Sequence, residues 1–110
     1  MQADPKKLEL IIYTLRNQYN VEEIWLFGSR AKCPARNNSD YDIMCVVSDL
    51  TLDDAINNDS RYAITQKIKN SVDLDLYAKK RSVFYDKIHI EDPYNFSYIC
   101  VTQGKKIFPI

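Results

Sequence analysis

The chain of 110 residues has only two glycines, one histidine and no net charge. Its 15 basic residues balance its 15 acidic ones, so no overall positive field attracts it to nucleic acid or to an anionic membrane. No apolar run has the length of a membrane-spanning helix, and polar residues follow Met1 where a signal peptide would be apolar. These absences predict a cytoplasmic protein that does not bind nucleic acid by itself.

Cysteine is also scarce. Cys33, Cys45 and Cys100 are too few and too widely spaced for a disulfide framework or for a CxxC metal site, which favours a reducing compartment. The length predicts one domain, residues 1–110, and the 45% of hydrophobic residues suffices for one core.

The pattern of apolar residues predicts alternating helices and strands. Asp4 and Pro5 are a helix-start signal, and a helix is expected over residues 5–19. Further helices are expected over residues 30–32, after Thr51, over 82–89 and from Phe96 to Gly104. Strands are expected over residues 24–27, 41–47, 72–78 and 105–110. This order predicts the α/β (α+β) class, with a small mixed sheet flanked by helices.

Two pairs of aspartates lie at the predicted strands. Asp40 and Asp42 begin one of them, and Asp73 and Asp75 lie on another. Residues i and i+2 of a strand share a face, so each pair points one way. An Asp-x-Asp alone is more often turn chemistry. Four carboxylates on one face would repel one another without a cation, however, and the two pairs together favour a Mg²⁺ site.

A Gly-Ser turn precedes the first aspartate pair. Gly28 and Ser29 end the apolar run 24–27, and such a turn is often no more than a turn. Glycine lets the backbone approach a phosphate closely, and N–H groups at a helix start bind phosphate oxygens. Beside two carboxylates, the turn has the parts that hold a triphosphate with Mg²⁺. Arg30 and Lys32 are equally consistent with phosphate contacts and with a solvated helix.

The run from Phe27 to Ile43 resembles the DNA polymerase β-like nucleotidyltransferase superfamily, and within it the minimal nucleotidyltransferases (MNT). Their signature is hG[SG], a spacer of about ten residues and Dh[DE]h, with a third acidic residue on a later strand. Phe27-Gly28-Ser29 and Asp40-Tyr41-Asp42-Ile43 match this signature, and Val72-Asp73-Leu74 resembles the later strand. Cys33 is a departure, because the family often has Gly there.

The resemblance implies a polymerase-β-like fold and the Mg²⁺-dependent transfer of AMP from ATP, with two ions that clamp the entering and leaving oxygens. The residues that it implies for nucleotide binding are Gly28, Ser29 and Arg30. The residues that it implies for catalysis and metal binding are Asp40, Asp42 and Asp73. Asp75 is the alternative third ligand, and the register relative to Tyr77 and Phe84 favours Asp73.

The resemblance also implies a protein partner. MNT proteins often pair with a HEPN-domain ribonuclease toxin and act as its antitoxin by adenylylating (AMPylating) it. The chain is therefore expected to modify a hydroxyl of such a toxin in a toxin–antitoxin system. Two alternatives stay open, a non-catalytic antitoxin that neutralises its partner by binding, and a transferase acting on RNA or a small molecule. The nucleotide preference and the oligomeric state are also open.

Overall fold

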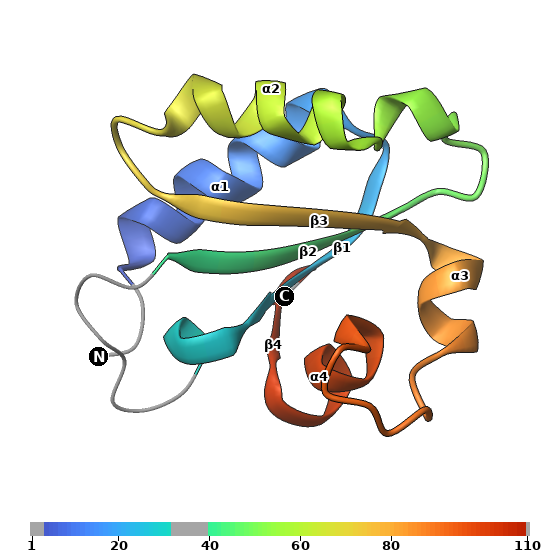
Figure 1. Ribbon diagram of the computed structural model, residues 1–110. Helices are drawn as coiled ribbons and strands as arrows, with labels where there is room; N and C mark the ends of the chain where they lie inside the picture. The colour runs from blue at the N-terminus through green and yellow to red at the C-terminus, as the bar shows by residue number, and fades with distance from the viewer. Residues whose placement is uncertain (1–3, 32–39, 110) are drawn as a thin grey trace.

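The computed structural model describes residues 4–31 and 40–109. Its centre is a four-stranded sheet with the order β3-β2-β1-β4 (Figure 1). The strands are β1 (Val21–Phe27), β2 (Tyr41–Val47), β3 (Leu74–Lys80) and β4 (Lys105–Phe108). β1 is antiparallel to both β2 and β4, whereas β2 and β3 are parallel. The predicted small mixed sheet is confirmed.

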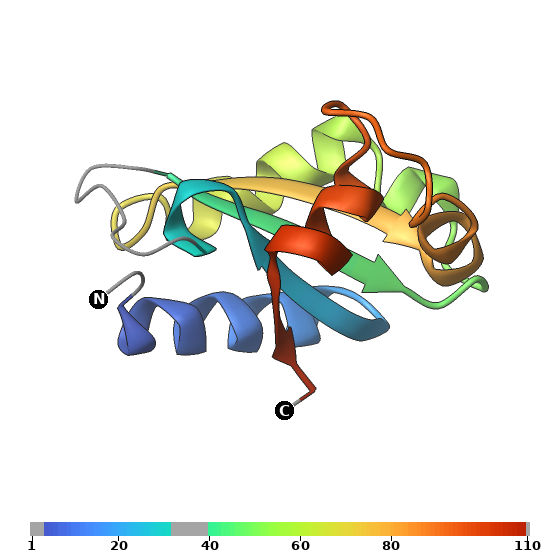
Figure 2. The ribbon, with the colours of Figure 1, turned by 90° about the horizontal axis from the view of Figure 1, so that it is seen from below.

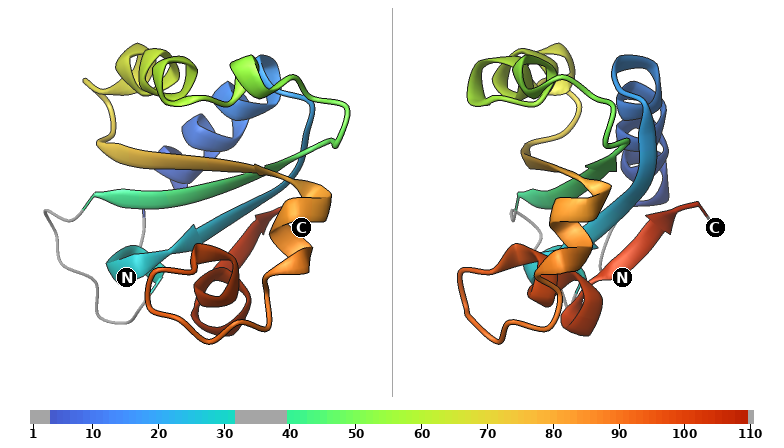
Figure 3. Two further views of the ribbon diagram at one scale, coloured as in Figure 1. Left: turned by 45° about the vertical axis from the view of Figure 1, so that its right-hand side comes forward. Right: turned by 90° about the vertical axis from the view of Figure 1, so that its right-hand side faces the viewer.

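Helices cover both faces of this sheet (Figure 3). The α-helices are α1 (Pro5–Gln18), α2 (Asn58–Ile68), α3 (Arg81–Asp86) and α4 (Phe96–Gln103), and the two 3₁₀ turns are η1 (Gly28–Ala31) and η2 (Asp53–Ala55). α1 and α2 pack on one face, and α3 and α4 pack on the other. Seen from below in Figure 2, α4 crosses in front of the strands.

The start of α1 is where the sequence predicts it. The side chain of Asp4 accepts a hydrogen bond from the Lys6 N–H (2.9 Å), and Pro5 occupies the first turn. The backbone N–H of Asp4 donates to the Tyr41 hydroxyl (3.0 Å). This bond ties the beginning of α1 to the beginning of β2.

The third strand starts later than predicted. A strand was expected over residues 72–78, but β3 begins at Leu74 and continues to Lys80. The N–H of Val72 donates to the carbonyl of Ile68 (2.9 Å), so this residue still belongs to the turn that ends α2. The prediction was therefore two residues too early at both ends, and Asp73 lies just before the strand.

Smaller corrections concern other boundaries. β1 begins at Val21 and not at residue 24, because its pairing with β2 extends back to Val47. α3 spans Arg81–Asp86 where a helix over 82–89 was expected. The short helix expected over 30–32 is the 3₁₀ turn η1, which starts at Gly28, and residue 32 lies outside the described residues.

The two faces of the sheet bury different side chains. The face toward α1 and α2 is mostly aliphatic, with Ile24, Leu26, Ile43, Cys45 and Val47. The face toward α3 and α4 is rich in rings, with Trp25, Phe27, Tyr77, Phe84 and Phe96. Asp42 is two residues before Met44 of the ring-rich cluster, so it lies on that face. The aspartates of β2 and β3 are thus at the end of the aromatic side of the sheet.

Within the described residues, no helix is long and apolar enough to cross a membrane. Cys45 and Cys100 are free and buried, and the raised pKa of each thiol, about 12, results mainly from that burial. Cys33 lies outside the described residues. Both described cysteines therefore act as small apolar side chains of the core.

Candidate functional site

Asp42 and Asp75 are direct neighbours across the parallel strands β2 and β3. Burial, followed by the negative charges of Asp75 and Asp40, raises the pKa of the Asp42 carboxyl to about 6. Protonated Asp42 also shares a hydrogen bond with Asp75. Three carboxylates therefore act on one another at this end of the sheet, and their shared charge favours a bound cation.

Asp40 and Asp73 lie one step earlier, just before the two strands. Both are exposed and line the same depression of about 230 Å³. The N–H of Tyr41 donates to the backbone carbonyl of Asp73 (3.0 Å), which holds the starts of β2 and β3 together. The structure therefore brings all four aspartates to one end of the sheet as two neighbouring pairs.

Gly28 lies directly against Asp42. It follows Phe27, which pairs with Asp42, and its φ of 72° is in the left-handed region. A Cβ atom on Gly28 would overlap the Oδ2 atom of Asp42. Any other residue would both strain the turn and displace the carboxylate. The turn predicted to admit a triphosphate is thus in contact with the carboxylate predicted to bind its Mg²⁺.

The next residues of the turn approach the same strand end. Ser29 and Arg30 belong to η1, which follows β1 immediately. The guanidinium of Arg30 lies 4.7 Å from the ring centre of Tyr41, the residue before Asp42. Arg30 is therefore packed beside the site. Lys32 lies outside the described residues.

A cavity of about 300 Å³ opens beside Gly28 and Asp42. Its other lining residues are Phe27, Tyr77, Phe96, Ile99 and Gln103. The ring centres of Tyr77 and Phe96 are 4.7 Å apart, and those of Phe27 and Phe96 are 5.3 Å apart. The cavity therefore joins a cluster of rings to the Gly28 turn and to Asp42. Sequence reasoning missed Gln103, because only the packing of α4 brings it to β2.

No group of three potential metal ligands is close enough to hold an ion by itself within residues 4–31 and 40–109. Mg²⁺ prefers carboxylate oxygens, and in phosphoryl-transfer sites it takes one or two of them together with substrate phosphates. Asp42 and its acidic neighbours fit such a shared site, because Asp75 and Asp40 place further negative charge beside a half-buried carboxyl whose pKa burial, and then these charges, raise.

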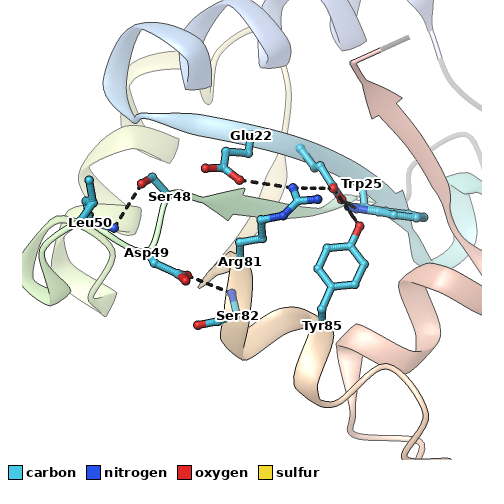
Figure 4. Close-up of polar contacts among 9 residues, drawn as sticks. Glu22, Trp25, Ser48, Asp49, Leu50, Arg81, Ser82 and Tyr85 are labelled. Atoms are coloured by element: carbon cyan, nitrogen blue, oxygen red, sulfur yellow. Dashed lines mark hydrogen bonds and ion pairs between the residues drawn. The ribbon is translucent and has the colours of Figure 1, made fainter.

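A further acidic side chain, that of Glu23, lies at the opposite end of the ring-rich face of the sheet. Sequence reasoning missed it. Its side chain is buried and accepts hydrogen bonds from Trp25 Nε1 (2.9 Å), the Tyr85 hydroxyl (2.8 Å) and Arg81 (3.0 Å) (Figure 4). The sequence signal that could have identified Glu23 is an acidic residue inside an otherwise apolar strand. Because its oxygens are occupied, Glu23 attaches α3 to the sheet and is no candidate ligand.

The chain is similar to known proteins both in sequence family and in structure. A family model described as polymerase beta, nucleotidyltransferase matches residues 9–108. The chain is 29% identical to a chain in the crystal structure of a toxin–antitoxin with AMP-PNP, with a TM-score of 0.63, and the match covers 89% of this chain and 69% of that one. No curated protein sequence matches.

Two further solved structures are similar. One is a tri-AMPylated Shewanella oneidensis HEPN toxin in complex with MNT antitoxin, with 27% identity, a TM-score of 0.60 and coverage of 96% of this chain and 71% of that one. The other is a mutant of the toxin–antitoxin MntA-HpeT, with 26% identity, a TM-score of 0.62 and coverage of 92% and 71%.

Proposed function

The chain belongs to the polymerase beta nucleotidyltransferase family, and on this basis we propose that it transfers AMP from ATP, with Mg²⁺, to a hydroxyl of a protein partner. The observation that carries the proposal is the contact between Gly28 and Asp42, with Asp75 beside them. It joins a turn that admits phosphates to a carboxylate pair that suits a cation.

Asp40 and Asp42 would ligate Mg²⁺, which neutralises the charge of the triphosphate and of the oxygens that enter and leave. Ser29 would bind a phosphate oxygen, and Arg30 would add positive charge nearby. The acceptor oxygen attacks the α-phosphorus, and the bond from that phosphorus to the bridging oxygen of the diphosphate breaks. The acceptor's proton passes to the third carboxylate, and diphosphate leaves.

The third carboxylate is Asp73 or Asp75. The sequence favours Asp73, and this assignment stays a prediction. The register supports Asp75 instead, because it is the cross-strand neighbour of Asp42 and the charge that raises its pKa most. We therefore propose Asp75 for this role and keep Asp73, beside Asp40, as the alternative.

Three observations support ATP and a toxin as the substrates. The cavity lined by rings beside Gly28 suits an adenosine, and one similar structure is a toxin–antitoxin with AMP-PNP. Another similar structure holds a tri-AMPylated HEPN toxin with its MNT antitoxin. We propose that the partner of this chain is a HEPN-type toxin and that the chain is its cytoplasmic antitoxin.

The test uses this chain co-purified with a HEPN toxin encoded beside it. The mixture is incubated with labelled ATP, with and without Mg²⁺, and the intact mass of each protein is measured. We expect the toxin to gain one or more AMP units only with Mg²⁺ and intact Asp42. Tight neutralisation of the toxin without any mass change would indicate the non-catalytic antitoxin, and label on RNA would indicate an RNA-directed transferase.

A further inference from the structure

The described sheet ends at β3, and α2 runs beside this edge strand (Figure 1). Two depressions, of about 250 and 230 Å³, lie between them. Thr65 and Leu74 line both depressions, so the two form one continuous groove. We call it the edge groove. It extends from Asp40 to Tyr77, and three of the four aspartates of the candidate site, Asp40, Asp73 and Asp75, are among its lining residues.

The two walls of the edge groove carry opposite charges. Arg61 and Thr65 of α2 and its C-cap residue Lys69 follow one another at intervals of four residues and so lie on one side of the helix. On the strand side, Asp40, Asp73 and Asp75 are among the residues that line the groove. A ligand that fits must present an anionic group toward α2 and an uncharged group, or one bound to a cation, toward the strands.

Arg61 is held in place. Its NH1 group donates to the carbonyl of Leu76 on the edge strand (3.3 Å), and its Nε donates to the carbonyl of Asn57 (3.4 Å). A third N–H bonds the side chain of Asn58. A guanidinium has five N–H donors, so these three bonds to described residues leave two donors for a ligand. The basic wall is therefore preorganised.

The edge groove also lies on the side from which the acceptor must approach the carboxylates. Gly28 follows β1, Asp42 is the second residue of β2, and Asp75 is the second residue of β3, so the three follow one another across the strands. In an in-line displacement, the attacking and leaving oxygens are on opposite sides of the phosphorus. With the diphosphate at the Gly28 turn, the attacking hydroxyl arrives from the side of Asp75, where the edge groove is.

We propose that the edge groove binds the acceptor, an extended polypeptide segment whose hydroxyl residue is flanked by acidic side chains. This inference rests on the proposed function. The acidic neighbours would bond Arg61 and Lys69, and the hydroxyl would point toward Asp75. A nucleic acid fits less well, because its regularly spaced phosphates would also face Asp40 and Asp73.

The probe is the peptide acetyl-Gly-Glu-Tyr-Glu-Gly-amide, added to the isotope-labelled chain in the presence of Mg²⁺ and AMP-PNP. Nuclear magnetic resonance then reports both affinity and place of binding. We expect the largest shifts at Arg61, Thr65 and Lys69. A matched peptide with Lys in place of both Glu residues should bind at least about tenfold more weakly, since its charges face the basic wall.

Three variants locate the binding. Arg61→Glu and Lys69→Glu should each weaken the acidic peptide at least about tenfold, with AMP-PNP affinity changed less than about twofold. Lys67→Glu is the matched control, because Lys67 is exposed on the same helix and does not line the groove. Lys69 is exposed, so its variant is informative even where Arg61→Glu unfolds.

The inference is wrong if the peptide does not bind, if Lys67→Glu weakens it as much as Lys69→Glu, or if an oligonucleotide competes better than the peptide. Transfer of label from ATP separates the two proposals. Groove-dependent binding without transfer contradicts the proposed function and supports the groove. Transfer to the toxin that Lys69→Glu leaves unchanged supports the proposed function and overturns the groove.

Discussion

Two acidic sites on the same face of the sheet differ in how their charge is compensated. Glu23 is only 4% exposed, and its oxygens accept bonds from Trp25, Arg81 and Tyr85. Asp42 is half-buried, and the groups that act on it most strongly are other carboxylates. A buried carboxylate with donors on every side holds the fold together, whereas one pressed against like charge is suited to a cation.

The ionisable groups near the two sites reflect this difference. Burial, followed by the hydrogen bond to Glu23, raises the pKa of Tyr85 to about 12, so its hydroxyl remains a donor at neutral pH. Burial, followed by the charges of Asp75 and Asp40, raises the pKa of Asp42 to about 6. The first network is complete without a ligand, and the second is not.

The largest expected effect is on transfer activity at the Asp42 end. Asp42→Asn keeps the shape of the side chain and removes its charge, so AMP transfer should fall roughly 1,000-fold, the loss expected when a metal ligand is removed. Initial rates with saturating ATP and Mg²⁺ measure this, and circular dichroism checks the fold. Asp86→Asn, an exposed change on α3, is the control. Unchanged transfer by the Asp42 variant would contradict the metal assignment.

Removing the carboxylate of Glu23, at the other end of the sheet face, should lower stability and leave activity intact. Glu23→Ala removes the acceptor of three donors and should lower the free energy of unfolding by about 3 kcal/mol. Urea denaturation measures it. Glu22→Ala removes an exposed ion pair with the half-exposed Arg81 (3.2 Å) and should cost less than about 1 kcal/mol. A Glu23 variant as stable as the wild type would remove the distinction between the two sites.

A smaller effect is expected from the third carboxylate. Asp75→Asn should reduce transfer about 100-fold, because Asp75 is the proposed proton acceptor and the neighbour of Asp42 across the strands. Asp73→Asn should reduce it less, since Asp73 precedes the strand. Parallel rate measurements at saturating Mg²⁺ compare the two. If Asp73→Asn is the more damaging change, the prediction made from the sequence is right and the register argument is wrong.

The smallest effect is on thermal stability without metal. Because the pKa of Asp42 is about 6 in the folded chain and near 3.8 as an ordinary carboxyl, the native state binds this proton more tightly than the unfolded state. The contribution of Asp42 to stability therefore falls as the pH rises from about 4 to about 6. Asp42→Asn should raise the Tm at pH 7.5 by a few degrees and leave it unchanged at pH 4.

Calorimetry in EDTA measures this, with Asp86→Asn as the control. Adding Mg²⁺ and AMP-PNP should raise the Tm of the wild type and abolish the advantage of Asp42→Asn, because binding to the native state stabilises it. A wild-type Tm that rises between pH 4 and pH 6 relative to that of the Asp42 variant would show that the carboxylate is compensated without a cation.

Much of the fold was predictable because its signals are local. The Asp4-Pro5 cap predicted the start of α1, and alternation predicted β2 with Asp42 on one face. The start of β3 was not predictable. The apolar side chain of Val72 fits the end of a helix and the beginning of a strand equally well. Only the hydrogen bond from its N–H to the carbonyl of Ile68 shows that it belongs to the turn after α2.

The partners of Glu23 show a second limit of prediction from the sequence. Arg81 and Tyr85 are 58 and 62 residues away along the chain, so no local pattern distinguishes this paired carboxylate from an unpaired one. The reverse holds for the Gly28 turn and the Asp-x-Asp strand, whose chemistry depends on neighbours in sequence. Both motifs can be identified from the sequence alone.

The amino-acid order was therefore sufficient to identify the Gly28–Ser29 turn, the aspartates 40 and 42 and the family they indicate, because backbone conformation and strand alternation act over a few residues. The pairing of Asp42 with Asp75 and the groove between α2 and the edge of β3 depend on the register of two parallel strands. That register is set by the packing of side chains from distant segments, and only the folded chain brings them together.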